Sequence, residues 1–176
     1  MNNEATKAFS SKQENLISYD LGWEVVSGSG ARPTVPGDVI SDDWLGECKT
    51  HVKPGQSILF STEVWIKICQ EALMKHRKPV LFVDDGSQKL DNTWVICYEH
   101  SIDNRNNLMV PIENFRKMRK NITFKNEVGQ KFMKDFIKGL PEDVANVYKY
   151  VVFSATWARS EVVVMTYATF KELYNK

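Results

Sequence analysis

Polar and hydrophobic positions at the start of the chain predict a helix followed by a strand. Residues 3–19 place their apolar side chains on one side of a helix, and Gly22 stands where a C-terminal cap is expected. Residues 23–27 alternate and are rich in β-formers, which favours a strand. The segment 28–37 is rich in Gly and Pro and is predicted to be a long loop with a functional role.

Two short strand candidates follow this loop. Residues 38–41 and 44–49 are separated by two aspartates, which favour a turn between antiparallel strands. Such a hairpin would bring Asp38 toward Glu47.

The middle of the chain predicts a helix and a buried pair of strands. Apolar positions recur with helical spacing over residues 61–77, with Trp65 in the core, while the polar residues fall mostly on the other side. Residues 80–83 form an uninterrupted apolar run typical of a buried strand, and residues 94–98 supply its antiparallel neighbour.

The last third of the chain gives a weaker pattern. Residues 111–120 and 125–138 are interpreted as helical, 148–153 and 161–166 as extended, and 169–175 as a short helix. Together the pattern predicts an α/β protein with a mixed β-sheet flanked by helices.

Length and composition fit one domain. The 176 residues, of which 43% are hydrophobic and 26% charged, are sufficient for a single core, expected over about 4–100 with a basic C-terminal extension over about 101–176. No apolar run approaches the ~18 residues of a membrane span, and no signal core opens the chain, so a cytoplasmic protein is expected. Three cysteines without CxxC pairing favour reduced thiols over disulfides or zinc.

The charge is unevenly distributed along the chain. Residues 105–138 carry nine basic and three acidic residues, a balance of +6, so the remainder carries −5 of the formal net charge of +1. This asymmetry suits a protein with an acidic pocket for a cation and a basic flank for a polyanion. A solvated helical surface is the alternative interpretation.

The predicted hairpin carries a candidate metal site. Within one strand Glu47 and Lys49 point to the same face, and Cys48 points to the other. Two neighbouring carboxylates, Asp38 and Glu47, repel each other, and a hard cation such as Mg²⁺ relieves that repulsion. An ammonium on the same face can orient water and screen a phosphate, which are the parts that phosphodiester hydrolysis uses.

The chain resembles the PD-(D/E)XK nuclease superfamily in these residues. Pro36-Gly37-Asp38 followed by Glu47-Cys48-Lys49 is similar to its bipartite motif. Glu14 on a leading helix, a Gly-Trp-Glu-Val-Val strand, the turn Gly28-Ser29-Gly30 and a helix ending in Arg77-Lys78-Pro79 make it most similar to archaeal and phage Holliday-junction resolvases. The resemblance covers roughly residues 10–100 and implies a restriction-endonuclease-like fold.

The resemblance also implies roles for individual residues. It implies that Glu14, Asp38, Glu47 and the backbone carbonyl of Cys48 bind Mg²⁺, for which Mn²⁺ can substitute, and that Lys49 is the catalytic lysine. It also implies that Ser29 lies near the scissile phosphate. Sequence position and charge, rather than the resemblance, predict substrate contacts for Arg32, His51, Gln56, Arg116, Lys117, Arg119 and Lys120. The loop before Asp38 is longer than the usual resolvase connection. An exposed strand-end histidine and a simple helix cap are the alternatives for His51 and Gln56.

The expected activity is that of a Mg²⁺-dependent DNA endonuclease. The resemblance implies four-way or branched DNA as substrate, 5′-phosphate ends and a homodimer, because two opposed strands must be cut by two symmetric sites. A restriction-like or DNA-degrading nuclease acting on duplex or flap DNA is one alternative. A catalytically silent nucleic-acid-binding protein is the second, because a fold alone does not establish a reaction.

Overall fold

The computed structural model describes residues 3–27, 36–56, 58–98, 101, 122–124, 152–157 and 160–174. Its helices and strands follow one another as α1 (Asn3–Leu21), β1 (Glu24–Val25), β2 (Val39–Ile40), β3 (Trp44–Lys49), β4 (Ile58–Phe60), α2 (Thr62–Met74), β5 (Lys78–Asp84), the short 3₁₀ turn η1 (Leu90–Asn92), β6 (Thr93–Tyr98), β7 (Ile122–Phe124), β8 (Val152–Trp157), β9 (Ser160–Thr166) and α5 (Tyr167–Tyr174). No described helix combines the length and the apolar character needed to cross a membrane.

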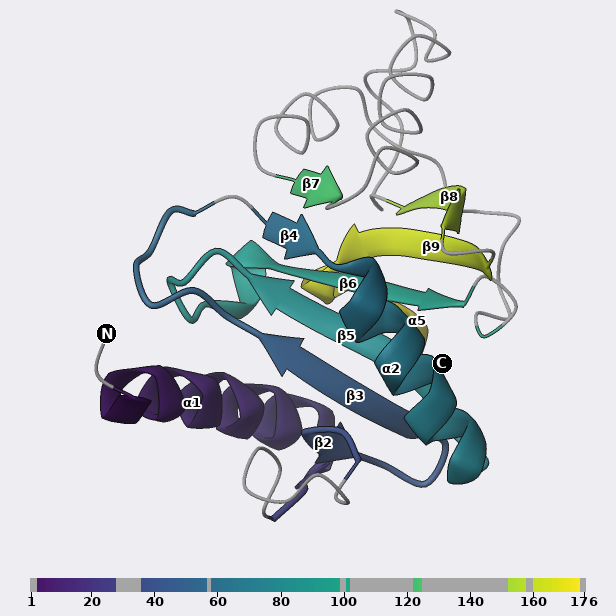
Figure 1. Cartoon of the computed structure of the whole chain (residues 1–176), viewed down its shortest axis with the longest axis horizontal. Coiled ribbons are helices and arrows are strands. Elements are labelled where there is room, and N and C mark those ends of the chain that lie inside the picture. Colours follow the sequence, from purple (N-terminus) through teal and green to yellow (C-terminus); the bar gives the residue numbers. More distant parts are fainter. Residues whose placement is uncertain are drawn as a thin grey trace, which may run out of the picture.

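A mixed sheet forms the centre of the molecule (Figure 1). Within the described chain its seven strands lie in the order β1-β2-β3-β5-β6-β9-β8. Strands β3 and β5 are parallel and are connected through α2, whereas every other neighbouring pair is antiparallel. The separate strands β4 and β7 form a short parallel pair. The predicted α/β class and mixed sheet are therefore confirmed.

Helices cover both faces of this sheet. Trp65, Ile68 and Ala72 of α2 pack with Leu45 and Leu81 in one hydrophobic cluster. A second cluster packs α1 and α5 against the other face, and it includes Ile17, Trp44, Cys48, Phe82 and Phe170. Alternate residues of β3 therefore face different helices, as the period of a strand requires.

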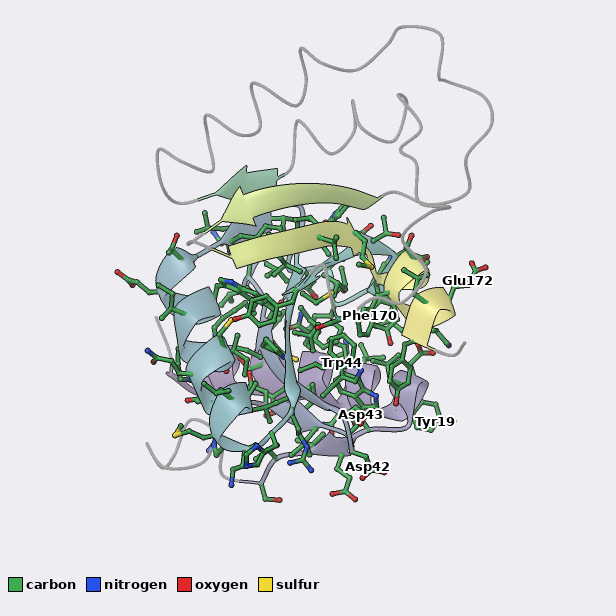
Figure 2. All side chains as sticks on the ribbon, turned by 90° about the vertical axis from the view of Figure 1, so that its right-hand side faces the viewer. Tyr19, Asp42, Asp43, Trp44, Phe170 and Glu172 are labelled. Atoms are coloured by element: carbon green, nitrogen blue, oxygen red, sulfur yellow. The ribbon has the colours of Figure 1, made fainter. Side chains whose placement is uncertain are left out.

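Aromatic side chains join the C-terminal helix to the sheet. Figure 2 shows Trp44 and Phe170 pointing toward one another, and their rings meet edge to face with centroids 5.4 Å apart. Phe170 also contacts Trp23, which follows α1 in the sequence. Asp20 of α1 accepts hydrogen bonds from Tyr167 Oη and Lys171 Nζ, both at 2.8 Å, so α1 and α5 are linked directly.

Several predicted boundaries shift in the structure. The helix expected over 61–77 ends at Met74, because the chain reverses at His76 with a positive φ of 54°. Strand β4 is not among the predicted strands, since three residues are too few to display a period. The three cysteines are free, as expected.

The predictions for the last third are tested only in part. Those over 111–120 and 125–138 lie outside the described residues, and of 148–153 only the last two are described, as the start of β8. Strand β9 and helix α5 confirm the expectations for 161–166 and 169–175.

Candidate active site

Asp38 is placed by the hairpin between β2 and β3. Val39 pairs with Gly46, and the N–H of Asp38 donates to the carbonyl of Gly46 at 2.7 Å, so Asp38 lies next to Glu47 as predicted. The side chain of Asp38 also contacts β3, because its Oδ2 accepts a hydrogen bond from the N–H of Cys48 at 2.8 Å. The carboxylate is thereby fixed at the edge of β3.

Glu47 is a buried carboxylate between two ammonium groups. Its side chain is 6% exposed, and Oε1 accepts a hydrogen bond from Lys49 Nζ at 2.5 Å. Its Oε2 has no hydrogen-bond partner among the described residues and lies 3.5 Å from Lys67 Nζ of α2. The predicted common face of Glu47 and Lys49 is therefore present, and it is the face that α2 covers.

Lys49 ends β3 with its ammonium toward solvent. Its side chain is 46% exposed. Burial acts to lower the pKa of Lys49, but the charge and hydrogen bond of Glu47, together with the charge of Asp38, raise it above the ordinary value. The ammonium form therefore persists at neutral pH. The carbonyl of Lys49 accepts a hydrogen bond from the buried Gln13 of α1 at 3.2 Å, which also fixes the end of the strand.

Cys48 contributes its backbone rather than its thiol. The thiol lies in the core beneath α1, where burial and then the nearby negative charges of Asp38, Glu14 and Glu47 raise its pKa well above the ordinary value. The N–H of Cys48 points toward Asp38. Because a strand residue directs its N–H and C=O to the same neighbour, the Cys48 carbonyl also points toward that edge.

Glu14 approaches this group from α1. Burial raises the pKa of its half-buried carboxyl to about 7, the negative charges of Asp38 and Glu47 add to the rise, and Lys49 opposes it. Gln13, the preceding residue of α1, donates to the Lys49 carbonyl, so this part of α1 lies against the end of β3. The structure thus brings together Asp38, Glu47 and Lys49 and places Glu14 on the adjoining turn of α1, and the roles of all four stay predictions.

A second buried network fixes the neighbouring strand end. Asp84, the last residue of β5, is fully buried, and its Oδ1 accepts hydrogen bonds from Thr50 Oγ1 at 2.5 Å and from the N–H of Gly86 at 2.6 Å. Burial raises the pKa of Asp84, although these two hydrogen bonds oppose the rise. Thr50 follows β3, so the network ties the ends of the parallel strands together.

Three residues near the site, Gln13, Lys67 and Glu71, are not among those predicted from the sequence. Glu71 Oε2 accepts the N–H of Gly37 at 3.0 Å, directly before Asp38, and Glu71 Oε1 lies 3.6 Å from Lys67 Nζ. The i,i+4 spacing of Lys67 and Glu71 is a visible signal, but it equally describes an ion pair on an exposed helix surface.

The substrate-binding predictions are placed unevenly. His51 is partly exposed two residues after Lys49. Gln56 precedes α2 but does not cap it, because β4 lies between them and Ser61 is the N-cap residue. Its N–H donates to the carbonyl of Asp85 at 2.9 Å, and its contact with substrate stays a prediction. The remaining predicted residues lie outside the described ranges, namely Ser29, Arg32, Arg116, Lys117, Arg119 and Lys120.

The donor set of the site fits a hard divalent cation. Within the described residues no three His, Cys, Asp or Glu side chains are already arranged around a metal position, since Asp38 faces a backbone N–H and Glu47 faces two lysines. Glu47 nevertheless buries one oxygen without a hydrogen bond, and Glu14 is a carboxyl whose ionisation burial and like charges oppose. A cation with a preference for oxygen would relieve both effects.

Comparisons of this chain with known protein families, curated proteins and solved structures find no match.

Proposed function

We propose that this protein is a Mg²⁺-dependent DNA endonuclease that hydrolyses phosphodiester bonds. One observation carries the proposal: the hairpin places Asp38 beside Glu47 and Cys48, with Lys49 hydrogen-bonded to Glu47 and with Gln13, the neighbour of Glu14 on α1, hydrogen-bonded to the Lys49 carbonyl. A structural salt bridge needs only one acid and one base, whereas this strand end brings two carboxylates and a lysine together beside α1.

The arrangement of elements supports the same proposal. Helix α1, the antiparallel strands β1, β2 and β3 and the short strand β4 precede α2, which returns the chain to β5 parallel to β3. Apart from β4, this order is similar to the core of the restriction-endonuclease-like fold, in which the carboxylates and lysine lie on the hairpin and its following strand. We therefore propose that fold for the described part of the chain.

The residues that would hold the ion are Asp38, Glu47 and the Cys48 carbonyl, with Glu14 completing the group. When bound there, Mg²⁺ supplies an activated water and neutralises charge on the phosphate. Asp38 cannot rotate freely, because Cys48 holds one of its oxygens. This fixed geometry reduces the reorganisation needed when substrate arrives.

Lys49 would act on the phosphate and on the attacking water. Its ammonium is half exposed at the strand end and is kept protonated by Glu47 and Asp38. A positive charge here stabilises the additional negative charge that develops on the phosphate oxygens during in-line attack. The Gln13 and Asp84 hydrogen bonds hold the strand end that presents it.

Branched DNA is the substrate that we propose, and the support for this step is the resemblance to resolvases. Paired cuts in a four-way junction require a homodimer. A monomeric mass at micromolar concentration would count against junction cleavage and would favour the duplex or flap nuclease. Absence of cleavage with DNA binding retained would favour the catalytically silent protein.

The test compares a labelled four-way junction with a linear duplex of the same sequence, in Mg²⁺ or EDTA. The variants are Asp38→Asn and, as the matched control, Asp42→Asn, which removes an exposed carboxylate from the turn at the opposite end of β3. We expect paired nicks in the junction for the parent and Asp42→Asn, and none for Asp38→Asn or in EDTA. Asp38→Asn should still bind DNA, because it removes negative charge that faces phosphate. Equal cutting of both substrates would retain the nuclease and discard junction preference.

A further inference from the structure

Lys67 is a second lysine at the candidate site. It lies on α2, and its Nζ is 3.5 Å from Glu47 Oε2, while Lys49 holds Glu47 Oε1. Two ammonium groups from different elements thus lie on either side of one buried carboxylate. The Lys67 side chain is 55% exposed, so solvent and larger ligands can reach it.

Glu71 keeps Lys67 at this position. The two residues are one helical turn apart, with Glu71 Oε1 3.6 Å from Lys67 Nζ. Glu71 is itself held, because its other oxygen accepts the N–H of Gly37 and its side chain is only 13% exposed. Lys67 would therefore keep one carboxylate partner if Glu47 turned toward a cation.

A divalent cation would offset the net negative charge of the site, so that an anionic phosphate could bind there. With every carboxyl ionised, Glu14, Asp38, Glu47 and Glu71 carry four negative charges against two positive charges on Lys49 and Lys67. One divalent cation brings the balance to zero and attracts Glu47 away from its lysine partners. A lysine released from Glu47 is then free to pair with the anionic substrate.

We propose that Lys67 is a substrate-contacting residue, which binds a phosphate of the DNA backbone adjacent to the cleaved bond. The proposal rests on the function proposed above and adds α2 to the DNA-binding surface. In the metal-free protein Lys67 pairs with Glu47 and Glu71; in the complex it keeps Glu71 and exchanges Glu47 for a phosphate oxygen.

The present contacts of Lys67 are weak enough to be exchanged for a ligand. Exposed lysine–carboxylate pairs contribute about 0–1 kcal/mol, and Lys67 lies 3.5 and 3.6 Å from its two partners, beyond good hydrogen-bonding distance. Glu47 already has a short hydrogen bond from Lys49. Exchanging Glu47 for a phosphate oxygen would therefore cost Lys67 little.

The test measures DNA binding as a function of salt in the otherwise unchanged chain, with Ca²⁺ in place of Mg²⁺, because Ca²⁺ takes the same oxygen ligands with a less strict geometry and cleavage is therefore not expected. Lys67→Met, Lys67→Arg and Lys75→Met are compared, the last removing an exposed lysine at the C-terminal end of the same helix. For each phosphate that the protein ceases to neutralise, the slope of log K against log salt should fall in magnitude by about 0.9. We expect this change and about tenfold weaker binding for Lys67→Met, and neither for Lys67→Arg or Lys75→Met. Thermal unfolding of each variant checks that the fold is retained.

Each result separates the two proposals. If the unchanged chain binds DNA in Ca²⁺ and Lys67→Met leaves the salt slope unchanged, Lys67 is only a surface ion pair and the inference is wrong. The same holds if Lys75→Met changes the slope as much as Lys67→Met. If the wild-type chain neither binds nor cleaves DNA, the proposed function fails and the Lys67 proposal fails with it.

Discussion

The turn before Asp38 should not tolerate a side chain at Gly37. This glycine has a φ of +67°, a conformation that L-residues other than glycine adopt at a cost of about 1–2 kcal/mol. A Cβ added here would lie 2.7 Å from Leu45 Cδ1 and 3.1 Å from the carbonyl oxygen of Gly46. The substitution Gly37→Ala therefore combines backbone strain with a steric clash.

Gly22 provides a matched control for the strain alone. Its φ is +69°, and a Cβ added there would meet no atom of the described residues within 4 Å. Gly22→Ala should lower the free energy of unfolding by about 1 kcal/mol. Gly37→Ala should add the cost of overpacking, about 1–3 kcal/mol, for a total of about 2–4 kcal/mol.

The stability assay is equilibrium unfolding in urea, and junction cleavage in Mg²⁺ is measured on the same samples at a temperature where each variant is folded. Because Gly37 donates its N–H to Glu71 and precedes Asp38, Gly37→Ala should also reduce cleavage, whereas Gly22→Ala should not. Equal losses of stability in the two variants would refute the role of the Leu45 contact. Full cleavage by folded Gly37→Ala would refute the view that this turn sets the position of Asp38.

Three further predictions concern the rest of the chain. Asp20→Asn should cost about 1 kcal/mol at pH 7 in urea unfolding. Burial acts to raise the pKa of Asp20, but the hydrogen bonds from Lys171 and Tyr167 hold it below its ordinary value. The stabilisation by Asp20 is therefore present above about pH 4 and is lost as the pH falls through the lower folded-state pKa. A stability difference between wild type and Asp20→Asn that grows toward low pH would contradict this prediction. Phe170→Ala should lower the free energy of unfolding by about 3–5 kcal/mol, because this side chain is 1% exposed and lies between aromatic rings. Tyr19→Ala, at a position 92% exposed, should change it by less than about 0.5 kcal/mol. Similar losses for both variants would show that the aromatic cluster contributes little. Replacing four basic residues by alanine, Arg116, Lys117, Arg119 and Lys120, should weaken DNA binding and reduce its dependence on salt. An unchanged salt slope would show that these residues are only solvated.

The hairpin and the common face of Glu47 and Lys49 could be predicted because both depend on local features. Two aspartates between short alternating segments specify a turn, and the period of a strand decides which side chains share a face. The same holds for α1, where Gly22 has the positive φ expected of its cap, and for Trp65, which is fully buried.

Other parts of the site depend on contacts between distant segments. Gln13 and Glu71 act through backbone groups of Lys49 and Gly37, which lie 36 and 34 residues away in the sequence. No local pattern distinguishes Glu71 from a solvated helix residue, because its partner is defined only after α2 packs on the sheet. The helix-cap alternative for Gln56 fails for a related reason, since β4, which separates it from α2, pairs with β7 and shows no pattern in its own three residues.

The pairing of β6 with β9 has a consequence for how the chain folds during synthesis. These neighbouring strands are separated by about sixty residues, and α5, which follows β9, covers the same face as α1. While the ribosome has yet to release α5, Trp23 and Trp44 lack their Phe170 partner and the outer edge of β6 has no strand beside it. Until β9 and α5 emerge, the nascent chain therefore exposes an aromatic surface and an unpaired strand edge, which promote aggregation and bind chaperones. We expect this sheet to fold slowly, because its N-terminal half is completed only when β9 and α5 have emerged.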